Sequence, residues 1–389
     1  MNPAKSVAIN IERGKLVKRN LKLSDGEIRA IGVNERIKYL GCSFEERMVF
    51  NIEIVDRLVS NIEKLITSPN LQPDQKLNII NQYIFPMLIY PLQAAPINKI
   101  LSEVITRLDV MIRRSVKAII GLPTSTIDEM FYAPRNLRGL GILRCSWEVH
   151  LQHYNIASKL NKLGDRLLDH VYDSINEMEL CKQSLQVNGI NSRTMRKELR
   201  LNAFNSWTTK QWQGIGVKNY QTLTACNNFM SNKKGLSFSE WTAAIKLNTN
   251  YANLRGVPGN RNTKSDLCRK CGKEKETPAH VTGYCVANNL QITARHHRVK
   301  HQIRQLLEEK DYECFEEAQL VDGFGSIRYA DIIAINRNGN AYIVDPTVRY
   351  ENNSDNQDEM IANKKASIYE SCIPDCMMKY VHMEKRTGM

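Results

Sequence analysis

Residues 328–348 read RYADIIAINRNGNAYIVDPTV, and this stretch decides the fold of the C-terminal part of the chain. Two apolar runs rich in β-branched residues flank an Asn-Gly pair, which is a strong local signal for a β-hairpin. A two-residue loop at Asn338-Gly339 would place Asp331 and Asp345 on different faces of the hairpin. A three-residue loop over 337–339, with the glycine in the left-handed conformation, would place them directly opposite each other. In that register the two carboxylates project side by side.

Two carboxylates that converge on one point form a site for a hard divalent cation such as Mg²⁺. Such an ion polarises a phosphodiester and lowers the pKa of an attacking water. Asp331 and Asp345 are therefore the candidate magnesium ligands of a hydrolytic site. Taken alone, they also fit two strand-end aspartates that cap turns.

A helix is predicted after the hairpin, opened by the capping-box spacing of residues 354–357. Ile361, Lys365 and Ile368 follow at i, i+4 and i+7, so Lys365 shares the face that packs inward. Lys364 lies about 100° around the helix from it. The helix thus directs a lysine toward the hairpin, and the sequence does not decide between Lys364 and Lys365.

A lysine aimed at a carboxylate pair can orient water or stabilise the charge that develops on a phosphorane-like transition state. The alternative is a lysine whose aliphatic stem covers the edge of the core. Tyr369 follows on the same helix. Two aspartates, an inward lysine and this tyrosine together favour a nuclease site.

A second motif precedes the hairpin. Two cysteines, a histidine and a third cysteine occur with the spacing C-x2-C-x8-H-x4-C, which can close a tetrahedron around Zn²⁺. A site with four protein ligands has no open position, so we expect a structural or binding role for zinc. The alternative is four unrelated residues in a chain with ten cysteines. The predicted ligands are Cys268, Cys271, His280 and Cys285.

The chain has 389 residues, with 54 Lys+Arg against 41 Asp+Glu, a formal net charge of +13. This balance favours a polyanionic partner such as nucleic acid, the alternative being charge that serves solubility. No run of about eighteen apolar residues is present, so we expect no membrane span. No secretory signal is visible at the start of the sequence, and the scattered remaining cysteines suit reduced thiols inside a cell.

Helical periodicity dominates from Phe44 to about Ile120, with a break predicted near Pro86. The clearest helix runs from residue 101 to 119, with an apolar stripe on one face and cations mostly off that stripe. These cations are candidate contacts to a nucleic-acid backbone, or else a solvated face. They are Arg107, Arg113, Arg114 and Lys117. Residues 146–185 are also predicted to be helical. Trp207, Trp212 and Trp241 in the following segment are interpreted as packing anchors, the alternative being platforms on which bases stack.

These motifs together resemble a known family. A zinc motif followed by an Asp-x13-Asp hairpin and a lysine helix is similar to the C-terminal half of Pol polyproteins from type-1 (non-LTR) retrotransposable elements. The relevant branch is site-specific and has a restriction-like endonuclease. Residues 2–6 and 38–41 resemble the end of the reverse-transcriptase palm and the motif that follows it. Helices up to about residue 120, with 132–135 and 138–142, resemble the thumb and the region after it.

The resemblance implies roles for the hairpin and helix residues. Asp331 and Asp345 would bind Mg²⁺, Lys365 would support the attacking water, Arg328 would steady a phosphate and Tyr369 would complete the site. Three departures stand out. Ala330 replaces the family's usual proline, Ile368 replaces a second basic residue, and the sequence contains no Phe/Tyr-x-Asp-Asp loop. Polymerase chemistry needs such carboxylates to hold two metal ions about 4 Å apart. We therefore expect this chain to be a fragment that does not polymerise DNA by itself.

The predicted fold class is multidomain, with a mainly α-helical thumb-like region, a small zinc knuckle and a C-terminal α/β restriction-endonuclease-like domain. The predicted segments are 1–41 (palm remnant), 42–145 (thumb-like), 146–260 (helical connector), 261–300 (zinc knuckle) and 301–389 (endonuclease).

The predicted function is Mg²⁺-dependent nicking of target DNA, which exposes a 3′-hydroxyl to prime reverse transcription of the element's RNA. Target DNA and element RNA are the expected partners. Synthesis in the cytoplasm and action in the nucleus follow from the resemblance. Two alternatives are an RNA- or DNA-binding module with an inactive nuclease, and a decayed open reading frame.

Overall fold

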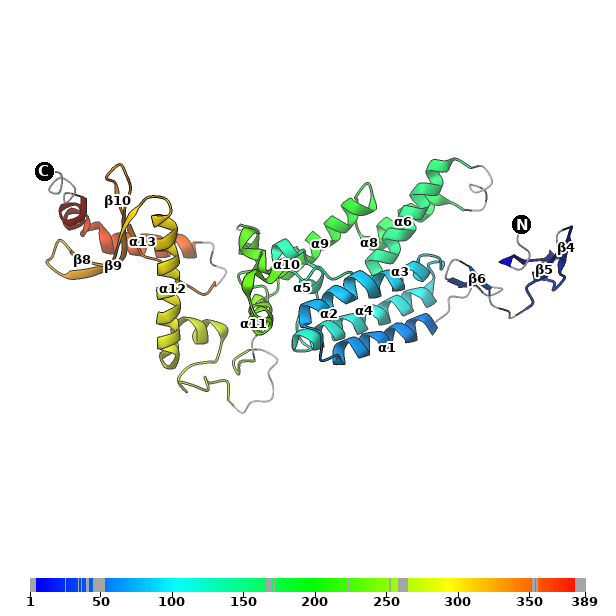
Figure 1. Ribbon diagram of the computed structural model, residues 1–389, viewed down its shortest axis with the longest axis horizontal. Helices are drawn as coiled ribbons and strands as arrows, with labels where there is room; N and C mark the ends of the chain where they lie inside the picture. The colour runs from blue at the N-terminus through cyan, green and yellow to red at the C-terminus, as the bar shows by residue number, and fades with distance from the viewer. Residues whose placement is uncertain are drawn as a thin grey trace. The chain divides into compact units, whose positions relative to one another are not determined.

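The fold is described from a computed structural model, in which the chain forms two compact units (Figure 1). One unit comprises Met1–Gln213 and Val217–Thr249, and the other Gly214–Gly216 and Asn250–Met389. The structure describes residues 5–381 apart from 25, 34, 36, 40–41, 45–52, 166–169, 171, 223, 252, 258–264, 352–353 and 355. The family-like segments at 2–4 and 40–41 lie outside these residues.

The first unit begins with short strands. A three-stranded sheet has the order β1-β5-β4, with β1 parallel and β4 antiparallel to β5, and two small hairpins join β2 to β3 and β6 to β7. Phe44 ends a strand, so the prediction that helix begins there is wrong. The first described helix starts at Glu53. The strands are β1 (Val7–Ala8), β2 (Ile11–Glu12), β3 (Lys15–Leu16), β4 (Leu21–Leu23), β5 (Gly26–Ala30), β6 (Ile37–Tyr39) and β7 (Cys42–Phe44).

Helices make up the rest of this unit. The periodic stripe predicted over residues 101–119 lies on the long helix α4, which Asn98 caps through its side chain and Gly121 ends in the left-handed conformation. The described helices and helical turns are α1 (Glu53–Thr67), α2 (Pro73–Ile79), η2 (Ile80–Ile84), α3 (Phe85–Leu92), α4 (Lys99–Ile120), α5 (Glu129–Tyr132), η3 (Arg135–Leu137), α6 (Cys145–Leu163), α8 (Ser174–Leu185), α9 (Ser192–Thr208), η4 (Val217–Gln221), η5 (Thr224–Asn227), α10 (Phe229–Asn232), η6 (Lys233–Gly235) and α11 (Phe238–Asn248).

Near Pro86 the chain changes its helical geometry, as the predicted break requires, but it remains helical. Helix α2 passes through the π-helical turn η2 into α3, and Pro86 lies in the first turn of α3. Proline has no amide hydrogen to donate and its ring crowds the preceding turn, so a widened turn is a way to keep the chain helical. Ile80, Ile84 and Phe85 are thereby directed into the core.

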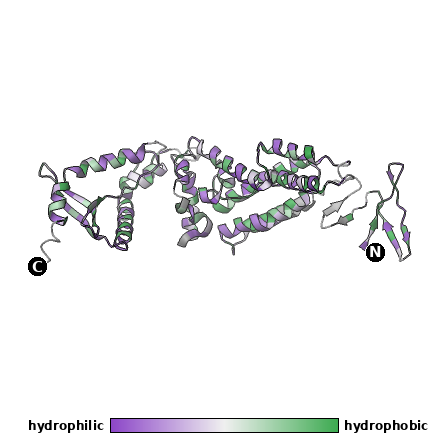
Figure 2. Cartoon of the chain, turned by 90° about the horizontal axis from the view of Figure 1, so that it is seen from above, coloured by the Kyte–Doolittle hydropathy of each residue, from purple (hydrophilic) through white to green (hydrophobic). Residues whose placement is uncertain are grey.

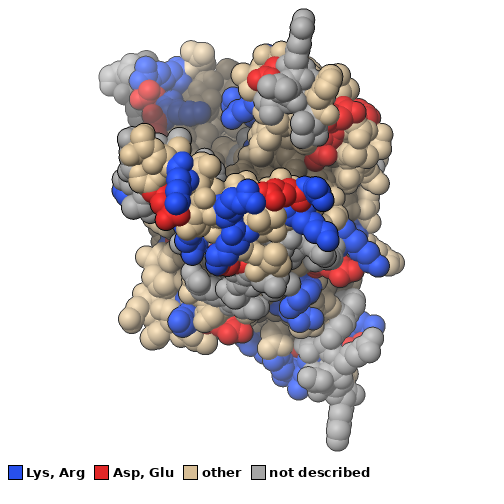
Figure 3. Space-filling model, turned by 90° about the vertical axis from the view of Figure 1, so that its right-hand side faces the viewer, with Lys and Arg blue, Asp and Glu red and all other residues tan. Residues whose placement is uncertain are grey.

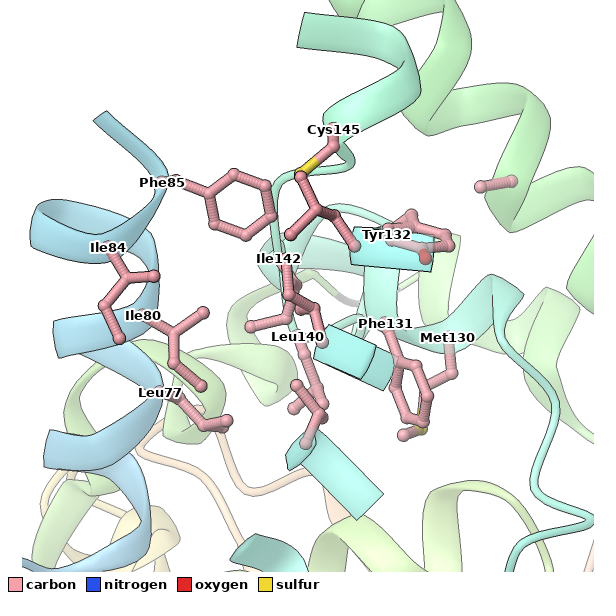
Figure 4. Close-up of a cluster of buried hydrophobic side chains, with 14 of the residues drawn as sticks. Leu77, Ile80, Ile84, Phe85, Met130, Phe131, Tyr132, Leu140, Ile142 and Cys145 are labelled. Carbon is pink, nitrogen blue, oxygen red and sulfur yellow. The ribbon is translucent and has the colours of Figure 1, made fainter. Parts of the chain in front are cut away.

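One hydrophobic core joins α1–α4 to the loop after α5 and to α9 and α11. Figure 2 shows apolar residues alternating with polar ones around these helices. In Figure 4, Leu77 and Ile80 from the α2–η2 segment face Phe131 and Leu140 from the α5 region. Trp207 and Trp241 are buried in this core, and each donates its indole N–H to a backbone carbonyl, which confirms them as packing anchors. Trp212 is only partly buried and is not part of this core.

Truncating Phe131 tests this core. Phe131 is fully buried, and Phe131→Ala is expected to lower the free energy of unfolding by about 3–5 kcal/mol, because it removes a large apolar surface and leaves a cavity. The midpoint of a urea titration should fall with little change in slope. The matched control Tyr83→Ala removes a ring that is 64% exposed and should change stability by less than about 0.5 kcal/mol. Equal midpoints for the two variants would contradict this account of the core.

The second unit combines helices with a three-stranded antiparallel sheet of order β10-β9-β8. Its longest helix, α12, packs against β8 and β9. Side chains of the α13–η9 segment, including Cys372 and Tyr380, pack into a cluster with the sheet. The elements are η7 (His280–Tyr284), η8 (Val286–Asn288), α12 (Asn289–Glu308), β8 (Glu313–Val321), β9 (Ile327–Ile335), β10 (Ala341–Val344), α13 (Gln357–Glu370), α14 (Ile373–Cys376) and η9 (Met377–Val381).

The hairpin has the three-residue loop. Strands β9 and β10 pair from Ala341 opposite Ile335 to Val344 opposite Ile332, and Gly339 has φ 79°. Continued by one residue, this register places Asp345 opposite Asp331. The predicted capping box at the following helix is wrong, because α13 begins at Gln357 with Asn356 as N-cap, whose side chain makes no capping bond.

No described helix is both long enough and apolar enough to cross a bilayer.

Candidate functional site

The two aspartates meet at one end of the β9–β10 hairpin. Asp331 lies within β9 and Asp345 directly after β10. Each carboxylate also has partners on a helix. The Lys365 ammonium lies 2.6 Å from Asp345 Oδ2, and the Tyr369 hydroxyl donates to the same oxygen at 2.8 Å. Asp331 Oδ1 lies 3.2 Å from His296 Nε2. Three side chains from two helices therefore converge on the carboxylate pair.

The electrostatics of the pair are asymmetric. Burial, together with a hydrogen bond to Asp345, raises the pKa of Asp331. Burial also acts to raise the pKa of Asp345, but hydrogen bonds from Lys365 and Tyr369 outweigh it, and the pKa of Asp345 is lowered. Opposite shifts are what two adjacent carboxylates produce when one of them has the stronger hydrogen-bonding and cationic partners. The two carboxylates thus repel each other when both are ionised, and a divalent cation bound between them would reduce this repulsion.

Lys365 and Lys364 have different surroundings. Lys365 is partly buried and bound to Asp345, whereas Lys364, at the preceding position of α13, is exposed. The geometry therefore selects Lys365 as the lysine of the site. The hydroxyl oxygen of Tyr369, one turn further along α13, also lies 3.1 Å from the Tyr329 carbonyl oxygen, so α13 contacts both sides of the hairpin.

Arg328 lies elsewhere. It precedes Asp331 by three residues on β9, so the two side chains leave the strand on opposite faces. Its guanidinium Nε lies 3.3 Å from Asp322 Oδ2, a buried carboxylate that also accepts backbone N–H bonds from Phe324 and Ser326. The structure thus uses Arg328 to hold the β8–β9 turn and does not bring it to the carboxylate pair.

His296 was missed in the sequence analysis. It lies on α12, 35 residues before Asp331, in the run Arg295-His296-His297. No spacing rule links this helix to the hairpin, because their proximity depends on how α12 packs against the sheet. The one feature of the sequence that points to this helix is the cluster of histidines and arginines between the zinc motif and the hairpin.

A cavity of about 590 Å³ opens beside the carboxylate pair. Its walls come from the Cys/His segment, from α12, from the chain after β10 and from α13. This volume suits a nucleotide-sized group. The side chains of Asp345 and Lys365 form part of the lining, so a bound ligand would contact the site directly.

The Cys/His motif forms a metal-ligand cluster. Cys268 Sγ lies 3.9 Å from Cys285 Sγ, Cys271 Sγ lies 3.2 Å from His280 Nε2, and all four ligand atoms are within 4.8 Å of one another. A tetrahedron with Zn–S bonds of about 2.3 Å has S···S edges of about 3.8 Å, so the donor set and its spacing fit zinc.

The charge state of the cluster also suits a cation. The backbone N–H of Lys273 donates to Cys271, and this bond, with others nearby, lowers the pKa of Cys271 to about 6. Thiolate is the form that binds metal. The His280 Nδ1 atom is buried and lies 3.6 Å from Glu274, a carboxylate on the side of the ring away from the cluster. The group can therefore hold Zn²⁺ with Nε2 facing the ion.

The four cations predicted to contact nucleic acid fall into two pairs. Arg113 Nε lies 2.8 Å and Lys117 Nζ 3.2 Å from the carboxylate of Asp128, so these two serve the fold. Arg107 and Arg114 are exposed and line a groove between α1 and α4. Figure 3 shows basic and acidic side chains interspersed on the face that it displays. Within the described part of the chain, Arg107 and Arg114 are the two of this set for which no ion pair is found, so they are available to a polyanion.

Comparison with known proteins gives relatives of one kind. The chain is 24% identical over 310 residues to the retrovirus-related Pol polyprotein from type-1 retrotransposable element R2 of Popillia japonica, covering 77% of this chain and 61% of that protein. The protein of the same description from Nasonia vitripennis is 22% identical over 315 residues, covering 79% and 29%. The retrovirus-related Pol polyprotein from type-2 retrotransposable element R2DM of Drosophila melanogaster is 21% identical over 328 residues, covering 81% and 30%.

No protein-family model matches the chain. The chain spans 29–61% of the length of the curated relatives it matches. The alignments confirm the relationship inferred from the motifs.

Proposed function

We propose that this chain, a relative of part of the Pol polyproteins of R2 retrotransposable elements, is a Mg²⁺-dependent endonuclease that nicks DNA. The observation that carries the proposal is the convergence of Asp331, Asp345, Lys365 and Tyr369 at the open end of a hairpin. The α12–hairpin–α13 unit is assigned to a restriction-endonuclease-like fold on the same grounds. The product of cleavage would be the 3′-hydroxyl from which reverse transcription of element RNA starts.

Asp331 and Asp345 supply the oxygen ligands that Mg²⁺ prefers, and their mutual repulsion fits a cation between them. When bound, Mg²⁺ supplies Lewis-acid polarisation of the phosphodiester and a more acidic water. In the hydrolysis, the water oxygen bonds to phosphorus, the P–O3′ bond breaks, and a proton reaches the departing 3′-oxygen. The products are a 3′-hydroxyl and a 5′-phosphate.

The chain's own residues would position and stabilise this reaction. Lys365 holds Asp345 in place and puts a fixed positive charge where negative charge develops on the phosphoryl oxygens. Tyr369 shares the same oxygen and limits the orientations open to the carboxylate. His296 performs the corresponding positioning for Asp331 from α12.

The remaining features fit a polyprotein that handles nucleic acid. A zinc-bound Cys/His segment would form a rigid wall of the cavity, and the exposed Arg107 and Arg114 would contact a phosphate backbone. Target DNA and element RNA are the proposed partners, and the nucleus is the proposed site of action. A second candidate function, nucleic-acid binding without cleavage, is favoured by the net charge of +13 and by these exposed arginines.

The proposal is tested by incubating the purified chain with supercoiled plasmid and Mg²⁺ and measuring the nicking rate, with matched variants of the two neighbouring lysines. Lys365→Ala is expected to lower the rate by about 10²–10³-fold, because a preorganised donor at the developing charge is lost. Lys364→Ala removes an equal charge one position away and should leave the rate nearly unchanged. No nicking by the unsubstituted chain would favour the binding function, and equal effects of the two substitutions would contradict the assigned role of Lys365.

A further inference from the structure

Two arginines line the cavity beside the carboxylate pair and have no acidic partner among the described residues. Arg295 comes from the second turn of α12, and Arg349 from the extended chain after β10. The Nε atom of Arg295 is buried and has no hydrogen-bond partner. A buried guanidinium N–H without an acceptor is costly, so it marks a place where an acceptor is expected to bind.

Several other arginines of the same unit are paired with carboxylates. Arg304 binds Glu308 and Glu316, Arg269 binds Glu276, and Arg337 binds Asp311. Arg295 and Arg349 differ from them by sharing a cavity whose lining, among the described residues, has one acidic side chain, Asp345. That carboxylate is already bound by Lys365 and Tyr369.

The charge of the cavity lining is therefore unbalanced. Three side chains with fixed positive charge, those of Arg295, Arg349 and Lys365, line it against the single carboxylate of Asp345. Placing like charges around one concave surface raises the local potential and attracts an anion. The planar guanidinium group matches the oxygens of a phosphate, with which it forms paired hydrogen bonds.

We propose that Arg295 and Arg349 form a phosphate pocket that binds the backbone of the DNA strand being cut, at a phosphate adjacent to the scissile one. The phosphate pocket rests on the proposed nuclease function. It extends that function by identifying the occupant of the cavity as the substrate strand. The scissile phosphate lies at Asp331 and Asp345, and the neighbouring phosphate enters the cavity between α12 and the chain after β10. Tyr284, which is 56% exposed and lines the same cavity from the Cys/His segment, flanks this path.

The first test measures DNA affinity without cleavage. The full chain is titrated with a short DNA duplex in Ca²⁺ at several salt concentrations, for the unsubstituted protein and for Arg295→Gln and Arg349→Gln. Each substitution should reduce the slope of log affinity against log salt by about one, because one phosphate contact is lost. Arg295→Lys keeps the charge and should keep most of the slope.

The control is Arg298→Gln, which removes an exposed arginine from the same helix that does not line the cavity. Its salt slope should match that of the unsubstituted protein. An equal loss of slope in Arg298→Gln would show that general charge on α12 carries binding and would overturn the pocket. Retained zinc content in each variant shows that the unit is still folded.

The second test locates the contact on the DNA. A neutral methylphosphonate next to the mapped cut site should weaken binding by the unsubstituted chain and have little further effect on Arg295→Gln, because the same contact cannot be lost twice. Cleavage with unaltered slopes in both arginine variants would overturn the pocket and leave the nuclease standing. Arginine-dependent binding without any cleavage would leave the pocket and remove the nuclease. Tighter arginine-dependent binding to single-stranded RNA than to DNA would overturn the DNA assignment.

Discussion

Asp345→Asn is expected to lower the rate of Mg²⁺-dependent nicking by at least about 10³-fold, since a bound metal ion contributes several kcal/mol to the transition state. The substitution removes one metal ligand of the pair and the negative charge that orients Lys365 and Tyr369. Asparagine is nearly isosteric with aspartate, so the hairpin should stay intact. The rate is measured on supercoiled plasmid over a range of Mg²⁺ concentrations.

The matched control for this prediction is Asp358→Asn, which neutralises an exposed carboxylate in the first turn of α13. It should leave the nicking rate and its dependence on Mg²⁺ unchanged. DNA binding measured in Ca²⁺ should survive Asp345→Asn, because the substitution adds no negative charge to the cavity. If nicking persists in Asp345→Asn at a rate close to that of the unsubstituted chain, the metal-binding role of the carboxylate pair is wrong.

Removal of a zinc ligand should strongly change the metal content and the local stability of the Cys/His segment. The purified chain is expected to contain about one zinc ion, and His280→Ala should lose it, because three cysteines without the histidine leave an open, weaker site. Structural zinc contributes on the order of 10 kcal/mol to small zinc-dependent folds, so the segment around residues 268–285 should unfold locally. Metal analysis and protease sensitivity of this segment measure the two effects.

His301→Ala is the control for the zinc prediction, because His301 is exposed on α12 and lies outside the Cys/His cluster. It should retain the full zinc content and the original protease pattern. An unsubstituted chain that is stably folded and free of metal would end the zinc interpretation.

The parts of the site that depend on local geometry could be predicted from the sequence. The hairpin register follows from an Asn-Gly loop with glycine in the left-handed conformation, and this fixes which residues are opposite each other. The spacing of Cys268, Cys271, His280 and Cys285 likewise specifies a compact cluster. Helical periodicity reduced the candidates for the lysine of the site to Lys364 and Lys365. The contact with Asp345, which the structure shows for Lys365, distinguishes the two.

The parts that depend on tertiary packing could not be predicted. His296 reaches Asp331 only because α12 lies against the sheet, and no sequence period encodes that placement. Arg113 and Lys117 lie off the apolar stripe of α4 as expected, yet Asp128, in the segment that follows α4, folds back and binds both. Arg328 was assigned to the site from the family pattern. Strand alternation alone would have argued against this, because it places the side chains of Arg328 and Asp331 on opposite faces of the sheet.

The geometry of α12 has a mechanical consequence. Its N-terminus is fastened to the Cys/His segment through Asn288, which accepts from Lys270 and donates to the Val281 carbonyl. His296 lies seven residues into the helix, about 10 Å along its axis, and Lys300 beyond it is clamped by Glu316 and Glu317. The helix is thus tied at its N-terminus to residues next to the Cys/His ligands, and its middle contacts Asp331. If zinc holds the Cys/His segment and the carboxylate pair cuts DNA, as proposed, loss of zinc would also disturb α12 and its contact with Asp331. Loss of cleavage on adding a chelator would then not identify which ion takes part in the chemistry.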